Sequence, residues 1–234
     1  MKVSFLIIGA LGIFASAASA APVCIAGGTM ASYVALGNGG CTIGNLLFSN
    51  FVYGSTGHQN GIAVSASEVF LDPVNIGTYN PGPGIVFSSS GWFVNSASLI
   101  DDSYVDSSIA FDVSVVSGAP IIKDGTLILG PYSALGTGLA DIAETLTPQG
   151  GSGLQLQVDS GGPFTANVDF TPVNRVHVLK DLFIFVPQGE ASGSARINSF
   201  EEDFSEAPEP VSTALIGSGL VALGFWRRRS MQRS

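Results

Sequence analysis

Short segments in which apolar and polar residues alternate recur along most of the chain, and they constrain its fold more than any other feature. Because successive side chains of a β-strand point to opposite faces, each segment has one face for a core and one for solvent. We therefore predict an all-β fold, an antiparallel, jelly-roll-like β-sandwich of about ten strands. The clearest segments are residues 62–67, 109–115, 154–159, 164–170 and 176–186.

Clusters of Gly, Pro, Asn and Asp separate these segments and predict the turns between strands. Residues 81–84 and 149–153 are predicted loops, and residues 123–125 are a predicted hairpin turn between two apolar runs. Only residues 134–143 allow a helix, and their glycines argue against one. No repeat or internal boundary is visible, so we expect one extracellular domain over residues 21–206.

The N-terminal 20 residues have the three parts of a secretory signal peptide. Lys2 is the basic residue, residues 5–14 form a short apolar helix, and Ala18 and Ala20 are the small residues of a cleavage site. The sequence therefore predicts export and removal of residues 1–20 by signal peptidase. An uncleaved membrane anchor is the alternative, and the short apolar core argues against it.

The C-terminal segment, residues 207–234, combines a short motif, an apolar run and a basic cluster. Sixteen mostly apolar residues, 211–226, would form a helix about 24 Å long, which can span a membrane transiently with help from flanking arginines. The positive cluster should stay in the cytoplasm and the motif outside the membrane. The motif is Pro208, Glu209 and Pro210, and the cluster is Arg227, Arg228 and Arg229.

This order of motif, helix and arginines resembles the PEP-CTERM sorting domain, over about 25 residues of the chain. The resemblance implies that an exosortase cuts near the motif after transient insertion in the inner membrane. It also implies release toward the cell envelope or an extracellular polysaccharide matrix. A plain C-terminal anchor is the alternative. Either way, we expect an exported protein.

Cys24 and Cys41 are the only cysteines, and both lie in the predicted exported domain. An even number of cysteines in an oxidising compartment predicts a disulfide. Closing this loop would stabilise the fold by about 3 kcal/mol in the chain-entropy model. Two free thiols are the alternative.

The domain is strongly acidic. Residues 21–206 hold 17 acidic residues against four Lys and Arg, a formal net charge of −13. Phosphate backbones would be repelled, so we expect no nucleic-acid partner. The densest group, Asp101, Asp102 and Asp106, is a candidate calcium site, with a solvated loop as the alternative. No other cofactor is expected.

Few residues indicate catalysis. His58 lies in a predicted loop and His177 on a predicted strand, and neither is part of a known catalytic motif. Trp92 is expected in the core. The outer strand faces are expected to present Ser, Thr, Asn, Gln and Asp rather than rows of aromatic rings. We therefore assign no catalytic residue.

The sequence favours a non-enzymatic structural or interaction protein of the envelope or polysaccharide matrix. A carbohydrate-binding module is one alternative, and a secreted glycoside or ester hydrolase is a second. Two or three exposed aromatic rings in line on one sheet would favour the binding module. A deep pocket with converging carboxylates or a histidine-activated nucleophile would favour the hydrolase.

Overall fold

The computed structural model describes residues 20–77, 82–95, 101–116, 121–189 and 192–207. The predicted signal helix, with Ala18, and the predicted sorting tail, with the motif at 208–210 and the arginines at 227–229, lie outside these ranges. Ala20 is the first described residue and is exposed. Within the described ranges, no helix is both long and apolar enough to cross a membrane.

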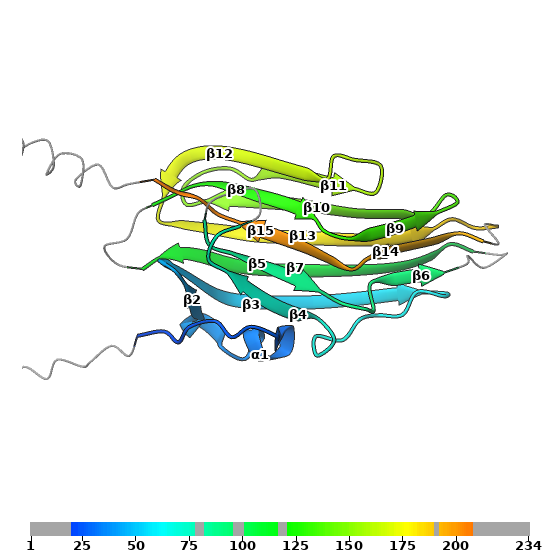
Figure 1. Cartoon of the computed structure of the whole chain (residues 1–234), viewed down its shortest axis with the longest axis horizontal. Helices are drawn as coiled ribbons and strands as arrows, with labels where there is room; N and C mark the ends of the chain where they lie inside the picture. The colour runs from blue at the N-terminus through cyan, green and yellow to red at the C-terminus, as the bar shows by residue number, and fades with distance from the viewer. Residues whose placement is uncertain (1–19, 78–81, 96–100, 117–120, 190–191, 208–234) are drawn as a thin grey trace, which may run out of the picture.

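Two antiparallel sheets packed face to face form the body of the molecule, which confirms the predicted all-β sandwich (Figure 1). The six-stranded sheet has the order β11-β10-β13-β7-β3-β2. Its strands are, in that order, Leu154–Asp159, Leu139–Pro148, Arg175–Val186, Ser103–Val115, Leu46–His58 and Cys41–Ile43.

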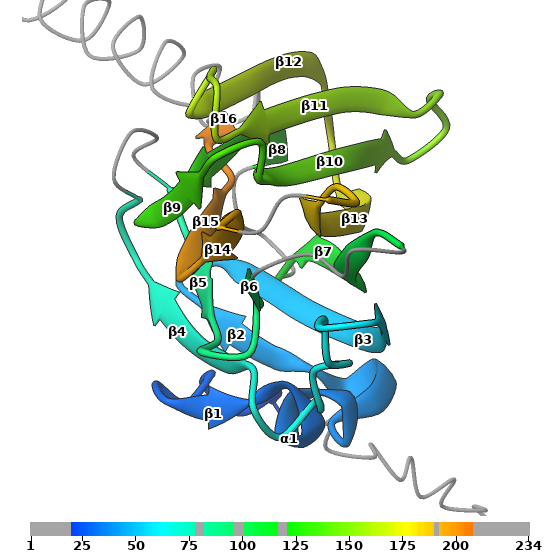
Figure 2. The same cartoon turned by 90° about the vertical axis from the view of Figure 1, so that its right-hand side faces the viewer.

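The seven-stranded sheet has the order β1-β4-β5-β15-β8-β12, and β16 also pairs with β8. A small third sheet, β6-β14-β9, closes the end of the sandwich that faces the viewer in Figure 2. The strands of the seven-stranded sheet are Gly28–Thr29, Phe70–Val74, Gly84–Ser88, Ser199–Asp203, Ile121–Leu129, Thr165–Val173 and Glu206–Ala207; those of the third sheet are Phe93–Asn95, Ser194–Ile197 and Tyr132–Leu135.

Aromatic side chains fill the space between the sheets. Phe87 and Phe200 stack at 4.8 Å between ring centroids, and Trp92 packs on Phe200 at 5.5 Å. Phe48 and Phe111 of the six-stranded sheet meet them from the other side. Fully burying each of these side chains contributes on the order of 1.5–3 kcal/mol. Trp92 is fully buried, as expected.

Two local expectations are wrong. Residues 123–125 are not a hairpin turn, because they lie within the continuous strand β8. Asp124 accepts hydrogen bonds from the backbone and hydroxyl of Ser205, and a Cβ at Gly125 would lie 2.5 Å from Leu146 Cδ1. The glycine therefore serves a close approach between the sheets rather than a turn. Residues 62–67 were predicted as a strand, but they lie between β3 and β4 and form no strand. Residues 134–143 contain parts of β9 and β10 and no helix, as their glycines indicated.

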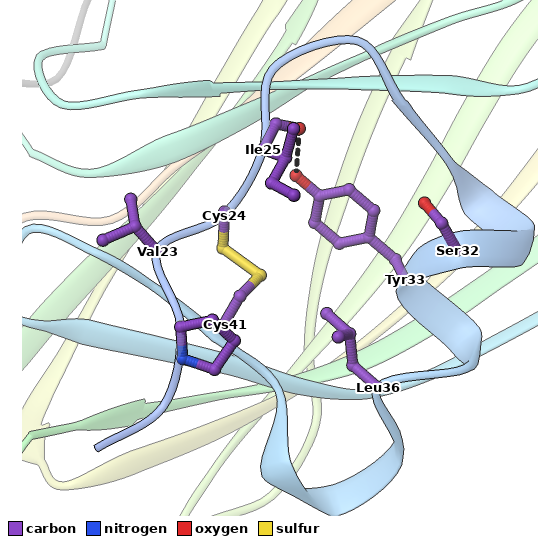
Figure 3. Close-up of a pocket in the computed structure, with 8 residues that line it drawn as sticks. Val23, Cys24, Ile25, Ser32, Tyr33, Leu36 and Cys41 are labelled. Atoms are coloured by element: carbon purple, nitrogen blue, oxygen red, sulfur yellow. Dashed lines mark hydrogen bonds between the residues drawn. A yellow bond between two sulfur atoms is a disulfide. The ribbon is translucent and has the colours of Figure 1, made fainter. Parts of the chain in front are cut away.

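The N-terminal segment is tied to the sandwich by the predicted disulfide. Cys24 and Cys41 are bonded, with their Cα atoms 4.8 Å apart, and Tyr33 donates a hydrogen bond to the Ile25 carbonyl (Figure 3). Tyr33 lies on the short helix α1, Met30–Val34, which Thr29 caps. A 3₁₀ turn, Gly37–Gly39, follows it. The disulfide is confirmed, and such a bond is typical of exported proteins.

Candidate functional site

The solvent side of the six-stranded sheet, called the outer face below, gathers most of the chemistry-bearing side chains. Every second residue of β13 points inward, as Val178 and Leu182 do, and the residues between them point outward. Strand pairing aligns the outward positions across the sheet in rows. One row reads Asp159, Asp141, Phe183, Asp106 and Thr56; the next reads Gln157, Ala143, Asp181, Ser108 and Gly54.

A chain of aromatic rings lies at one end of the outer face. Phe185 stacks on Phe183 at 5.6 Å, Phe183 contacts Tyr104 at 5.8 Å, and Tyr104 stacks on His58 at 5.4 Å. All four residues are half-buried, so each ring leaves part of its surface open to solvent. The expectation that outer faces would lack aromatic rows is therefore wrong, because three strands bring these rings together.

A shallow groove of about 420 Å³, called the central groove below, runs across β3, β7 and β13 beside these rings. Its floor and walls combine hydroxyl, carboxylate and aliphatic groups. Gly54 carries no side chain, so the groove is open at this position. The lining residues are Gly54, Ser55, Thr56, Asp106, Ser108, Leu179, Lys180 and Asp181.

Carboxylates crowd together in the central groove. Asp181 and Asp106 are close enough for a hydrogen bond between their carboxyl groups when one of them is protonated. Burial, that hydrogen bond, and repulsion from Asp106 and Asp141 raise the pKa of Asp181 to about 6. Burial also raises the pKa of Asp141, with repulsion from Asp159 acting in the same direction. Like charges are therefore crowded in and beside the groove.

A second polar cluster occupies the other end of the outer face. Asp112 is nearly buried and accepts hydrogen bonds from Arg175 at 2.6 Å, Asn50 at 2.7 Å and His177 at 3.0 Å. These three donors lower the pKa of Asp112 against the opposing effect of burial. His177 is thus an exposed strand residue, as predicted, and its imidazole is oriented by Asp112.

The structure does not assemble the predicted calcium ligands. Asp101 accepts a hydrogen bond from His58 at 2.9 Å, and Asp102 accepts one from the Gln188 backbone. Asp106 instead lies in the central groove. Asp101 and Asp102 precede β7, whereas Asp106 lies four residues beyond Asp102 along the extended chain, a separation of roughly 13 Å. In the described part of the chain, no three His, Cys, Asp or Glu side chains are grouped so as to hold a metal.

A buried ionic cluster lies directly beneath the outer face. Lys180 Nζ donates hydrogen bonds to Glu144 and, at 2.7 Å, to Glu202, and all three side chains are fully buried between the sheets. Burial opposes the charge of Lys180, but the two carboxylates outweigh it and raise its pKa. Burial and then Glu144 raise the pKa of Glu202, which favours a proton on that carboxyl.

A smaller apolar pocket lies beside the disulfide (Figure 3). It has a volume of about 100 Å³, and Val23, Ile25 and Leu36 line it with the two cysteines and Tyr33. This volume is below the range of about 300–1,000 Å³ typical of ligand pockets. We assign it a packing role between the N-terminal segment and α1.

Sequence reasoning missed the aromatic chain and the buried ionic cluster. Both had a signal in the strand pattern. On residues 176–186 the core parity is apolar except for Lys180, and the outward parity includes Phe183 and Phe185. Lys180 is an ionisable residue at a core position, and Phe183 and Phe185 are aromatic residues at outward positions. Both features depart from the simple alternation that predicted the strand.

Comparison with protein-family models and with curated proteins finds no match. Among solved structures, TmCBM61 in complex with beta-1,4-galactotriose aligns at 12% identity and a TM-score of 0.28, over 65% of this chain and 88% of that one. Carbohydrate-binding modules of the β-sandwich superfamily, described as promiscuous in specificity, align at 9% identity and 0.26, over 71% and 58%.

The enzymatically active domain of bacteriophage CBA120 tailspike protein 4 aligns at 11% identity and a TM-score of 0.24, over 67% of this chain and 20% of that one. Similarities this low carry no argument about the ligand of this chain. The function of the outer face is therefore inferred from its own residues.

Proposed function

We propose that the protein is an exported polysaccharide-binding protein and that the outer face of its six-stranded sheet holds the sugar chain. The observation that carries this proposal is the chain of half-exposed rings, Tyr104, Phe183 and Phe185, beside the central groove. Rings in line on one sheet, each with part of its surface open to solvent, support a carbohydrate-binding module.

The chemistry of the outer face suits a sugar. A pyranose ring has apolar C–H faces and a rim of hydroxyl groups, so it needs both flat apolar surface and hydrogen-bond partners. The aromatic rings supply the apolar surface. Carboxylates accept hydrogen bonds from hydroxyl groups, while hydroxyl and amide side chains both donate and accept them. Asp106, Asp181 and Ser108 offer such partners in the groove, and Gln157 lies on the same face.

A binding role without turnover fits the groove better than hydrolysis. Paired carboxyl groups of glycosidases lie about 5–9.5 Å apart to admit the sugar bond or a water molecule. Asp106 and Asp181 are instead in hydrogen-bond contact, which leaves no room for either. The groove is also shallow, whereas the hydrolase alternative called for a deep pocket. We therefore propose no enzymatic activity.

Delivery to the matrix is the second part of the proposal. The resemblance of residues 207–234 to a PEP-CTERM tail, together with the signal-like N-terminus, supports export, transient insertion in the inner membrane and cleavage by an exosortase. The Cys24–Cys41 disulfide agrees with an oxidising destination. An exported β-sandwich with a sugar-binding outer face would then act as a non-enzymatic component of the polysaccharide matrix.

Binding is tested by affinity electrophoresis of the mature protein in gels that contain exopolysaccharide from the producing cells. The polysaccharide should retard the wild-type protein, and Tyr104→Ala with Phe183→Ala should weaken binding at least about tenfold, since central aromatic anchors often contribute more than 1.4 kcal/mol each.

Phe164→Ala is the matched control. Phe164 is an exposed ring that stacks on Tyr132 at 5.3 Å and lies off the outer face, so its loss should leave the retardation unchanged. A wild-type protein that migrates freely in the presence of its own exopolysaccharide would contradict the proposed function, as would equal loss in the control variant.

Sorting is tested by the intact mass of the protein recovered from wild-type and exosortase-deleted cells. We expect the wild-type product to lack residues 1–20 and residues after the motif, and the deletion product to retain the arginine cluster. A wild-type envelope protein that still carries Arg227, Arg228 and Arg229 would show a plain anchor instead.

A further inference from the structure

Four carboxylates of the outer face lie on the neighbouring strands β7, β13, β10 and β11, and two of them, Asp106 and Asp181, line the central groove. Asp106 and Asp181 are in direct contact, and Asp141 is close enough to Asp181 to repel it. Asp159 stands opposite Asp141 on the next strand and adds to the same charge. Two acidic side chains therefore line the groove, two more lie on the same face beside it, and the aromatic rings lie next to it.

No basic side chain on the described strands of the six-stranded sheet balances this charge. His58 is hydrogen-bonded to Asp101, and Arg175 and His177 are both held by Asp112 at the far end of the face. Lys180 points to the opposite side of the sheet, where Glu144 and Glu202 enclose it. The positive partner of the groove must come from outside this face.

Two carboxylates in contact need a hydrogen-bond donor between them, because ionised carboxylates only accept. A shared proton is one solution, and a bound cation is another. A metal ion such as calcium takes six to eight oxygen ligands, but the described residues provide no group of three ligating side chains. An ammonium group suits the pair better, since it brings one positive charge and three donors.

We infer that the central groove prefers a polysaccharide that carries protonated amino groups, such as a de-N-acetylated hexosamine polymer, over neutral and uronic-acid polymers. This inference rests on the proposed function and adds the chemical class of the ligand. The ammonium group lies between Asp106 and Asp181 and takes the place of their shared proton, while a sugar ring packs on Phe183 or Tyr104. Uronic-acid polymers are excluded because their carboxylates meet like charge.

The test compares retardation of the full mature protein by four soluble polymers. They are chitosan, N-acetylated chitin oligomers, a neutral β-glucan and polygalacturonate, in a buffer that keeps the amines of chitosan protonated. We expect chitosan to bind about tenfold more tightly than the neutral glucan, which corresponds to one charge-assisted hydrogen bond. Polygalacturonate should not bind.

Substitutions separate a specific site from attraction to a generally acidic surface. Asp181→Asn keeps the shape of the side chain, and its amide can still donate to Asp106, so the fold should persist while the preference for chitosan disappears. Asp169→Asn removes one exposed charge from β12 on the other sheet and should keep the preference. A preference lost equally in both variants would overturn the inference.

Different results would contradict the inference and the proposed function. Equal binding of chitosan and neutral glucan, both reduced by Tyr104→Ala, would overturn the preference for amino groups and leave polysaccharide binding intact. Absence of binding to all four polymers and to the native exopolysaccharide would overturn both.

Discussion

Lys180 and Asp181 are adjacent on β13, yet their environments differ in almost every respect. Lys180 points between the sheets, is fully buried, and has two carboxylates from two different strands as partners. Asp181 points to solvent, and its nearest charged neighbours, Asp106 and Asp141, have the same sign. The inward cluster supplies its own counter-charge, whereas the outward cluster lacks one.

This difference separates structural from binding charges in the same strand. Buried charges must be paired within the protein, because leaving one unpaired costs several kcal/mol. Crowded like charges at a surface cost less, since water screens them. The outer face can therefore keep a negative groove that a ligand completes, while the interior cannot.

The largest expected effect follows removal of the inward cation. Lys180→Met leaves Glu144 and Glu202 buried without a positive partner, and we expect the free energy of unfolding to fall by about 3–5 kcal/mol. Urea denaturation measures this loss. Asp181→Asn, one residue away, should change stability by less than about 1 kcal/mol, as is usual for surface substitutions.

A compensated variant checks the cause of that effect. Replacing Glu144 and Glu202 with Met as well should recover most of the stability, because no buried charge is then left unpaired. A loss below about 1 kcal/mol in Lys180→Met alone would mean that water reaches the cluster, and the contrast between the two faces of β13 would fail.

The sequence predicted the class of fold because alternation is a local property of each strand. Residues 154–159 and 176–186 both form strands with the predicted buried parity. The segment Lys123, Asp124 and Gly125 was wrongly predicted to be a turn, because its residues are typical of turns. Their actual role depends on Ser205 and Leu146, which lie far away in the sequence.

The candidate site could not be predicted in the same way. Tyr104, His58 and Phe183 come from three strands, and only the register between those strands brings the rings into contact. The same register brings Asp106 near Asp181 of the neighbouring strand, whereas Asp101 and Asp102 lie before the start of β7. A pattern within one segment contains no information on the register between strands. The calcium site was therefore predicted from proximity in sequence, and the central groove could not be predicted.

The central claim is that the outer face of the six-stranded sheet holds the polysaccharide. NMR titration of isotope-labelled mature protein with oligosaccharides released from the native exopolysaccharide tests it most directly. We expect the backbone signals that shift to belong to β3, β7 and β13, with the largest changes around Tyr104, Asp181 and Phe183. Shifts confined to the seven-stranded sheet or to the pocket beside the disulfide, with the outer face unchanged, would contradict this account.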